Sequence, residues 1–495
     1  MLAVLVLVTG ASGTDLAAAE YRVALFRKVG FTLWDPGWYA GHWTLDYSVL
    51  FPPLGAAIGI AAIDIVCVAV ASFAFELLVA ARFGRAGRAG ALLFAAGTVV
   101  QVAVGRVPFL LGGTLALLAL ALAARREPWS RSAAVALALA ATLASPLAGL
   151  FLGLAAGAWL LADLPRINLW AGAIVVVSLA PIAALELLFS GQGRMPFAPL
   201  DLAGQLVPLV ALALIVRRGP RVLRIGFALY ALLVIGAYVA PSALGVNATR
   251  LGTSVGLGVA ASLWAASTRT RLLVIIAAVP LLLGQWTPAR SALLGAYDPG
   301  TSARYFAPLI AYLLAHDSPL GRVEVVPLST HWESDYVAQR LPLARGWERQ
   351  LDTADNPIFY TAGRLTKRSY LAWLERNGVR FVALSDAPID YAGIREAALI
   401  RAGVPGLPLT WQSRHWRVYA LSPSPAIVSG AGQLERESGS KLVLAVRREG
   451  SLVIRVRGGA NWRVSAGSAS LRPGPDGWLA LDASRPGRVV LEISP

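Results

Sequence analysis

Charged residues and cysteine are both scarce in this 495-residue chain. Only 15% of the residues are charged, against about 25% in an ordinary soluble domain, which argues against a purely water-soluble enzyme. Hydrophobic residues make up 56% of the chain, and the mean hydropathy is +0.62. The single cysteine, Cys67, lies within an apolar run, which excludes an intrachain disulfide and a cysteine-based zinc site. The composition therefore predicts an integral membrane protein.

Several sequence motifs of soluble and ATP-driven enzymes are also missing. The chain has no Walker A sequence, no GxGxxG between a strand and a helix, no HExxH and no GxSxG elbow. ATP-driven transport, nicotinamide chemistry, zinc proteolysis and α/β-hydrolase catalysis lose support accordingly.

The basic residues that are present form short clusters between long apolar runs. The formal net charge is +16, but this spacing is typical of cytoplasmic membrane loops and not of a nucleic-acid groove, so no nucleic-acid partner is expected. The clusters fall in every second loop, at 82–88, 125–131, 166, 217–224 and 269–271. The positive-inside rule then places the N-terminus in the cytoplasm and both the loop at 14–53 and the tail outside the cell membrane.

About eleven apolar runs are long enough to predict transmembrane helices, the first of them being short for a bilayer core. They cover residues 1–13, 54–81, 89–105, 107–124, 133–145, 147–162, 168–189, 200–216, 224–241, 251–267 and 272–287. A change of composition near residue 290 ends this membrane domain, which we place at 1–290. We predict an extracytoplasmic α/β domain at 291–425 and a small β-sandwich at 426–495, where apolar and polar residues alternate between Gly and Pro turns.

The first outer loop, at 14–53, carries the densest group of candidate functional residues. Asp15 precedes a segment with the apolar spacing of an amphipathic helix suited to the membrane surface. Aromatic residues then flank carboxylates, as a sugar-binding cleft requires, although an interfacial aromatic belt gives the same composition. The polar and aromatic candidates of this stretch are Trp34, Asp35, Trp38, Tyr39, His42 and Tyr47.

This loop resembles that of the GT-C superfamily, multispan glycosyltransferases that use polyprenyl-phosphate-linked sugars. The resemblance rests on the acidic start of the loop, the turn WYAGHW (38–43) and the segment YSVLFPPL (47–54). The chain is more closely similar to a mostly uncharacterised bacterial group related to that superfamily. Further segments similar to that group are GVNATRLG (245–252), HWESDYVAQRLPLARGWERQLD (331–352) and WRVYAL (416–421).

The resemblance implies that Asp15 is the catalytic carboxylate, which would accept the proton of an acceptor hydroxyl. An alternative role for Asp15 is to cap the following helix, and Asp35 is a second catalytic candidate that also suits a turn before Pro36. Asn247 and Arg250 are candidates for binding the donor phosphate, with Arg106 and Arg194 as weaker ones. No metal site is predicted, but a divalent cation near His42 stays open because some superfamily members require one.

The leading hypothesis is a bacterial cell-envelope glycosyltransferase that moves a hexose or pentose from a polyprenyl-phosphate donor to a glycan, lipid or protein acceptor. Its partners would be that donor, the acceptor and the lipid bilayer. Two alternatives stay open. One is a non-catalytic protein of the same fold that binds surface glycan, and the other is a secondary transporter, which should show two similar halves.

Overall fold

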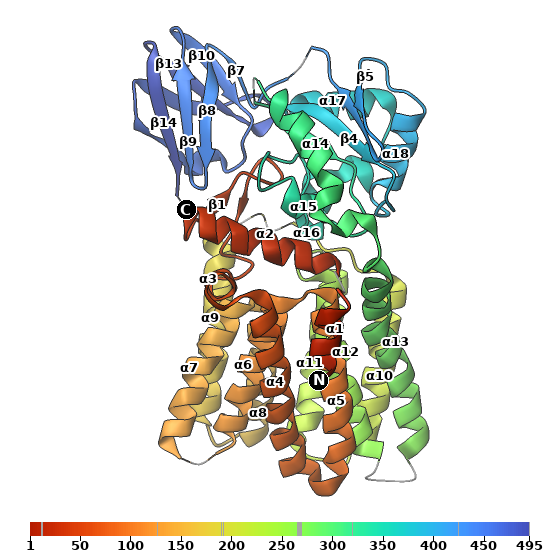
Figure 1. The fold of residues 1–495 in the computed structure, drawn as a ribbon. Coiled ribbons are helices and arrows are strands. Elements are labelled where there is room, and N and C mark those ends of the chain that lie inside the picture. The colour runs from red at the N-terminus through yellow and green to blue at the C-terminus, as the bar shows by residue number, and fades with distance from the viewer. Residues whose placement is uncertain are drawn as a thin grey trace. The chain divides into compact units, whose positions relative to one another are not determined.

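The computed structural model describes residues 1–10, 13–125, 127–189, 191, 193–264, 270–318, 320–423 and 425–494 (Figure 1). The chain divides into two compact units. The helical unit comprises Met1–Ala19 and Asp46–Ala296, and the mixed unit comprises Glu20–Leu45 and Tyr297–Pro495. Most of the predicted first outer loop thus belongs to the same unit as the tail. Arg126 and Arg269, which are part of the predicted arginine clusters, lie outside the described residues.

Each predicted apolar run overlaps a helix of the helical unit (Figure 1). These helices are α1 (Leu2–Val8), α4 (Ile60–Phe83), α5 (Gly87–Val104), α6 (Val107–Ala123), α7 (Pro128–Ala144), α8 (Pro146–Asp163), α9 (Leu169–Leu188), α10 (Pro199–Val216), α11 (Arg221–Val239), α12 (Arg250–Trp264) and α13 (Arg271–Gly295). The run predicted at 54–81 is interrupted at Gly59, whose φ of +83° separates α3 (Phe51–Ile58) from α4.

Six segments of the described chain are long and apolar enough to cross a membrane. They are Ile60–Val104, which contains both α4 and α5, and Pro146–Asp163, Leu169–Leu188, Pro199–Val216, Arg221–Val239 and Arg271–Gly295. Helix α1 has seven residues and rises about 10 Å, which is well short of the roughly 30 Å hydrocarbon core. The apolar helices agree with a membrane protein.

Short side chains allow the helices of this unit to pack closely. Alanines at 119, 123, 134, 138, 141 and 156 form the core between α6, α7 and α8. The predicted breaks between neighbouring runs are also present. Gly105 ends α5 in the left-handed conformation, and the hydroxyl oxygen of Ser145 accepts a hydrogen bond from the backbone N–H of Ala148 at the start of α8.

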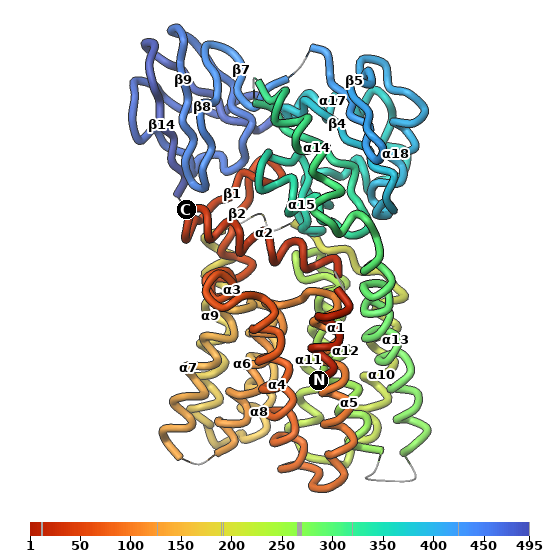
Figure 2. Tube along the Cα trace, viewed as in Figure 1, coloured from red at the N-terminus to blue at the C-terminus, as the bar shows by residue number. Residues whose placement is uncertain are grey.

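Helix α2 (Thr14–Val29) begins in the helical unit and ends in the mixed unit, and Figure 2 traces it into the hairpin of β1 (Trp34–Asp35) and β2 (His42–Trp43). The expectation of a one-sided amphipathic helix needs correction. Tyr21, Arg22 and Val23 are all buried, although successive helical residues point about 100° apart. The segment is therefore packed against protein on several faces.

The first part of the tail folds around a four-stranded sheet in the order β3-β4-β6-β5. Strand β3 (Arg322–Val325) pairs in parallel with β4 (Val379–Ser385), whereas β6 (Trp416–Ala420) pairs antiparallel with both β4 and β5 (Leu409–Gln412). The associated helices are α14 (Ala303–Ala315), α15 (Glu333–Tyr336), α16 (Arg349–Asp355), α17 (Lys367–Arg376) and α18 (Ile394–Arg401). This α/β arrangement follows the predicted mixture of helical and strand patterns.

The last part of the tail consists of two antiparallel four-stranded sheets. One has the order β12-β13-β10-β7, with β7 (Val428–Gly430), β10 (Gly450–Ile454), β12 (Ala469–Pro473) and β13 (Leu479–Ala483). The other has the order β11-β14-β9-β8, with β8 (Gly432–Ser438), β9 (Lys441–Val446), β11 (Trp462–Ala466) and β14 (Gly487–Ile493). Alternate apolar residues such as Leu442, Leu481 and Leu491 are fully buried, so the alternating pattern in the sequence becomes the core.

Direct contacts connect the two parts of the tail. The backbone N–H of Ile427 donates to the carbonyl of Leu320, and the buried guanidinium of Arg322 donates to the carbonyl of Arg455. Ser424, close to the predicted boundary at 425/426, lies outside the described residues.

Candidate functional site

Asp15, Arg106 and Arg250 come together in the helical unit and form what we term the Asp15 cluster. Arg106 Nε donates a hydrogen bond of 3.1 Å to Asp15 Oδ2, and Arg250 Nη2 lies 3.8 Å from the same oxygen. The side chains of Asp15, Arg106 and Arg250 are 22%, 21% and 23% exposed, respectively. The cluster is thus within reach of a ligand.

Two glycines allow Asp15 to approach Arg106. A Cβ atom on Gly13 would lie 2.3 Å from the backbone of Val104, and one on Gly105 would lie 2.4 Å from the backbone nitrogen of Leu16. Gly105 also has a φ of +83°, which residues with side chains rarely adopt. The start of α2 therefore packs directly on the end of α5, immediately before Arg106.

Arg250 is held at the start of α12 by hydrogen bonds of a buried tyrosine. Tyr230 Oη donates to the carbonyl of Ala248 and accepts from the backbone N–H of Gly252, with both distances 2.9 Å. The guanidinium of Arg250 also lies 5.8 Å from the ring centroid of Phe109, within range of a cation–π contact. These contacts orient the arginine toward Asp15.

The chemistry of the Asp15 cluster suits an anionic ligand next to a carboxylate. Two guanidinium groups and one carboxylate leave a formal charge of +1, and guanidinium groups bind phosphate oxygens in a bidentate manner. The capping role considered for Asp15 needs correction. Helix α2 begins at Thr14, so Asp15 is its second residue and not the N-cap, and its carboxylate contacts the two arginines.

Three further candidates belong to the helical unit, and they differ in burial and in their relation to the Asp15 cluster. Tyr47 is close enough to Arg250 for an electrostatic interaction. Asn247 is half-buried in the short helix η2 (Gly245–Thr249), directly before Arg250 in the chain, and Arg194 is exposed.

The aromatic residues predicted to shape a sugar cleft are interior residues of the mixed unit. Trp34, Trp38 and Tyr39 are 2%, 0% and 1% exposed. Trp38 Nε1 donates to the carbonyl of Ser334, and its ring stacks between those of Tyr21 and His42. Because protein atoms cover their faces, these side chains present no open surface to a sugar, and the predictions of a cleft and of an interfacial belt are both corrected.

A strained turn holds these aromatic residues in place. Tyr39 and Ala40 have φ values of +56° and +63°, and a Cβ on Gly41 would lie 2.2 Å from the ring of Trp34. Tyr39 Oη donates to the carbonyl of Glu348 and accepts from the backbone N–H of the same residue. The WYAGHW segment therefore has a packing role in this structure.

Asp35 and His42 are also buried in the mixed unit, and not in the unit that holds Asp15. Asp35 Oδ2 accepts a hydrogen bond of 2.8 Å from Tyr21 Oη, and Oδ1 accepts from the backbone N–H of Gly37. Burial raises the pKa of Asp35, and it lowers the pKa of His42 to about 3. With both oxygens already hydrogen-bonded and the side chain 2% exposed, Asp35 does not have the accessibility that a catalytic base needs.

The segment at 331–352 forms a buried polar network. His331 stacks on Trp347 at a centroid distance of 3.5 Å, and its ring nitrogens lie 3.4 Å from carboxylates of Glu333 and Asp390. Arg345 forms ion pairs with the buried acids Glu324, Asp352 and Glu396. This network connects α16, α18 and β3, which explains why so polar a segment lies inside the unit.

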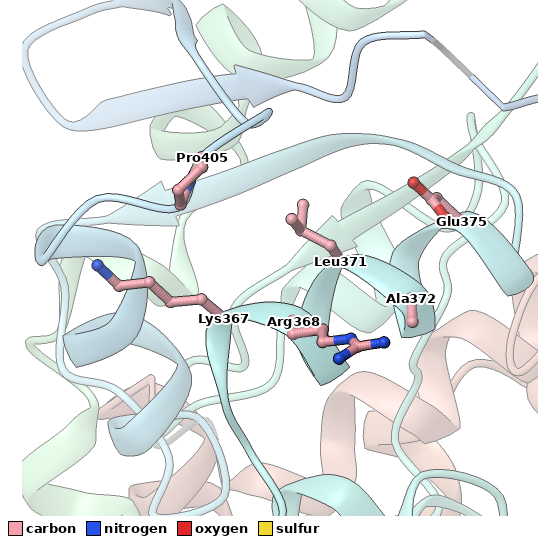
Figure 3. Close-up of a pocket in the computed structure, with 6 residues that line it drawn as sticks. All are labelled: Lys367, Arg368, Leu371, Ala372, Glu375 and Pro405. Atoms are coloured by element: carbon pink, nitrogen blue, oxygen red, sulfur yellow. The ribbon is translucent and has the colours of Figure 1, made fainter.

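Several hollows lie in the mixed unit. A groove of about 490 Å³ runs along α17, where the side chains of Lys367 and Arg368 extend in opposite directions (Figure 3). A cavity of about 320 Å³ has Asp35 among its lining residues and includes parts of α2 and β8. The groove along α17 contains none of the predicted site residues.

The structure brings Arg106, which the sequence indicated only as a weaker phosphate candidate, directly beside Asp15. The Gly105-Arg106 break between two apolar runs was the available signal, since it places a cation at the end of α5 opposite to the arginine cluster at 82–88. Among the described residues, no group of three or more His, Cys, Asp or Glu side chains is arranged to hold a metal ion. The described residues therefore provide no ligand set for the divalent cation that was left open near His42. No protein-family model and no curated protein matches this sequence.

Proposed function

We propose that this protein is a membrane glycosyltransferase of the GT-C type that uses a polyprenyl-phosphate-linked sugar as donor. The observation that supports the proposal most directly is the partly exposed Asp15 between Arg106 and Arg250, at the ends of apolar helices. A lipid-linked phosphate needs cations at the end of membrane-spanning helices, where its head group would lie. Transfer of the sugar to a hydroxyl needs a nearby base.

In this mechanism Arg106 and Arg250 hold the phosphate of the donor. The acceptor hydroxyl attacks the anomeric carbon, and its proton passes to the Asp15 carboxylate. A bond forms between the acceptor oxygen and the anomeric carbon, while the bond from that carbon to the phosphate oxygen breaks. Polyprenyl phosphate leaves with the electron pair, stabilised by the two guanidinium groups.

We further propose that the Asp15 cluster faces the extracytoplasmic side of the cell membrane, with about eleven spans and an extracytoplasmic tail. The arginines at 82–88 lie around the start of α5, at the end opposite to Arg106, and Arg271 begins α13, the helix that follows α12 in the chain. A reporter enzyme fused after residue 495 should then be active only in the exported compartment. Activity of that fusion in the cytoplasm would refute this orientation.

The decisive experiment measures sugar transfer by the full-length protein in lipid nanodiscs. A panel of radiolabelled polyprenyl-phosphate hexoses and pentoses would be supplied with cell-envelope material as acceptor. Arg250→Gln removes one phosphate contact and should reduce transfer at least tenfold. Arg217→Gln, an exposed arginine at the end of α10, is the matched control and should retain transfer.

Failure of the unmodified protein to transfer any sugar of the panel would refute the proposal. That result would favour the non-catalytic alternative, in which the same fold binds surface glycan.

A further inference from the structure

A cavity of about 320 Å³ lies within the mixed unit, and we term it the α2–β8 pocket. Its walls come from the second half of α2, from β1, from the segment at 338–342 and from residues 435–439 at the end of β8. All of these segments belong to one compact unit. The volume is at the lower end of the range for small-molecule sites, about 300–1,000 Å³, and suits a ligand the size of a single sugar.

The floor of the pocket contains hydrogen-bonding groups that are largely withdrawn from solvent. Tyr21 and Asp35 are 4% and 2% exposed and are joined by their hydrogen bond. The Oε1 atom of Glu437 is also buried, and it has no hydrogen-bond partner among the described residues. A buried carboxyl oxygen without a partner costs free energy, which a ligand hydroxyl would recover.

A β-bulge turns Glu437 toward the interior. Leu434 and Glu437 lie opposite Leu444 and Leu442, which are both fully buried, and the pairing register shifts between 434 and 436. Directly opposed residues share a face of the sheet, so Glu437 is on the inner face. Without the extra residue, strict alternation from Leu434 would place it on the outer face.

The exposed rim of the pocket is mainly basic, whereas its floor is acidic. Lys28, Arg340 and Arg436 line it and are exposed, together with one exposed acid, Glu435, whose carboxylate pairs with Arg488, whereas the acids Asp35 and Glu437 lie deeper. Burial raises the pKa of Glu437 to about 7, so near neutral pH this carboxyl both donates and accepts hydrogen bonds. An anion at the floor would meet the acids, and a cation at the mouth would meet the basic rim.

We propose that the α2–β8 pocket binds one residue of a neutral, hydroxyl-rich saccharide, with the Oε1 atom of Glu437 as its main hydrogen-bonding atom and the Tyr21–Asp35 pair as buried packing beside it. Sugar hydroxyls donate and accept at the same time and therefore match a carboxyl group that can do both. The half-buried apolar surface of Leu25 provides a wall for the carbon face of the ring. This binding goes beyond the proposed transfer reaction, because it requires neither a donor nor the Asp15 cluster.

The test measures binding of free monosaccharides to the full-length protein in nanodiscs, with no lipid-linked donor present. The panel would be glucose, galactose, mannose, arabinose and N-acetylglucosamine, screened by saturation-transfer NMR and followed by calorimetry. Ser438→Trp places a large side chain at the exposed mouth of the pocket and should weaken binding at least tenfold. The matched control is Ser470→Trp, which alters an exposed serine on β12, an edge strand of the other sheet, and should leave binding unchanged.

Glu437→Gln should weaken the same binding about tenfold with little loss of folding, because the amide keeps the shape but accepts at only one of its two terminal atoms. Undiminished binding by a folded Ser438→Trp protein would overturn the proposal, as would failure of the unmodified protein to bind any sugar of the panel. Either result would leave the transfer assay unaffected. Conversely, Arg250→Gln should lose transfer and retain monosaccharide binding.

Discussion

Replacing Asp15 by Asn separates catalysis from binding within the Asp15 cluster. Asparagine has the same shape and is still able to hydrogen-bond to Arg106, but it carries no charge and is a far weaker base. Because Asp15 is inside α2 and not its N-cap, helix capping adds nothing to the effect. The matched control is Asp201→Asn, which alters an exposed carboxylate in the first turn of α10, as Asp15 lies in the first turn of α2.

The expected magnitudes follow from the distances in the cluster. The Asp15 carboxylate lies 3.1 Å and 3.8 Å from the two arginines, so a phosphate held by both guanidinium groups would be roughly 6 Å from it. At that separation, with partial solvent screening, the repulsion between carboxylate and phosphate is about 1–2 kcal/mol. Removing the charge should therefore tighten donor binding about tenfold. Loss of the general base should nevertheless reduce transfer about 100-fold or more.

The assay combines two measurements on the same nanodisc preparation. Donor affinity would be measured by titration with a polyprenyl-phosphate sugar, and turnover by the release of radiolabelled product. Near-normal transfer by a folded Asp15→Asn protein would show that Asp15 is not the base. Weaker donor binding would show instead that Asp15 serves mainly to position Arg106 and Arg250.

Three further predictions concern stability. Gly105→Ala introduces a Cβ 2.4 Å from the backbone of Leu16 at a φ of +83°, and it should lower the free energy of unfolding, measured by thermal unfolding, by about 2–4 kcal/mol. The control Gly113→Ala introduces a Cβ into open space and should be neutral or stabilising. Trp38→Ala should destabilise the protein by about 3–5 kcal/mol because that side chain is fully buried; an unchanged melting temperature with reduced transfer would restore its sugar-binding role. Burial raises the pKa of Glu437 from 4.5 to about 7, so between these pH values the folded protein keeps a proton that the unfolded chain releases. The free energy of unfolding should therefore fall as the pH rises from about 4.5 to about 7. Glu437→Gln should flatten this decline in unfolding measurements between pH 5 and 8, and identical slopes for both proteins would contradict it.

Much of the fold could be predicted because it depends on local pattern. A helix in an apolar environment must satisfy its backbone hydrogen bonds internally, so each long apolar run became a helix, and Gly105 and Pro146 ended or started helices as their backbone preferences require. The alternation of apolar residues after position 426 likewise predicted the β-rich end of the chain. In the candidate site, Asp15 and Arg250 could be selected as candidates because a charged residue beside each apolar run is visible in the sequence.

What only the tertiary structure decided are the features that join distant parts of the chain. The Asp15 cluster joins three residues that lie far apart in the sequence. Two glycines permit α2 to pack on the end of α5, which brings Asp15 to Arg106. Tyr230 fixes the start of α12, which positions Arg250. Burial is equally non-local: the same aromatic composition suits a sugar cleft, a membrane interface or a protein core, and long-range contacts such as that from Trp38 to Ser334 selected the core. The inward direction of Glu437 depends on the pairing register of β8 with β9, and a sequence pattern with a period of two does not reveal a one-residue bulge.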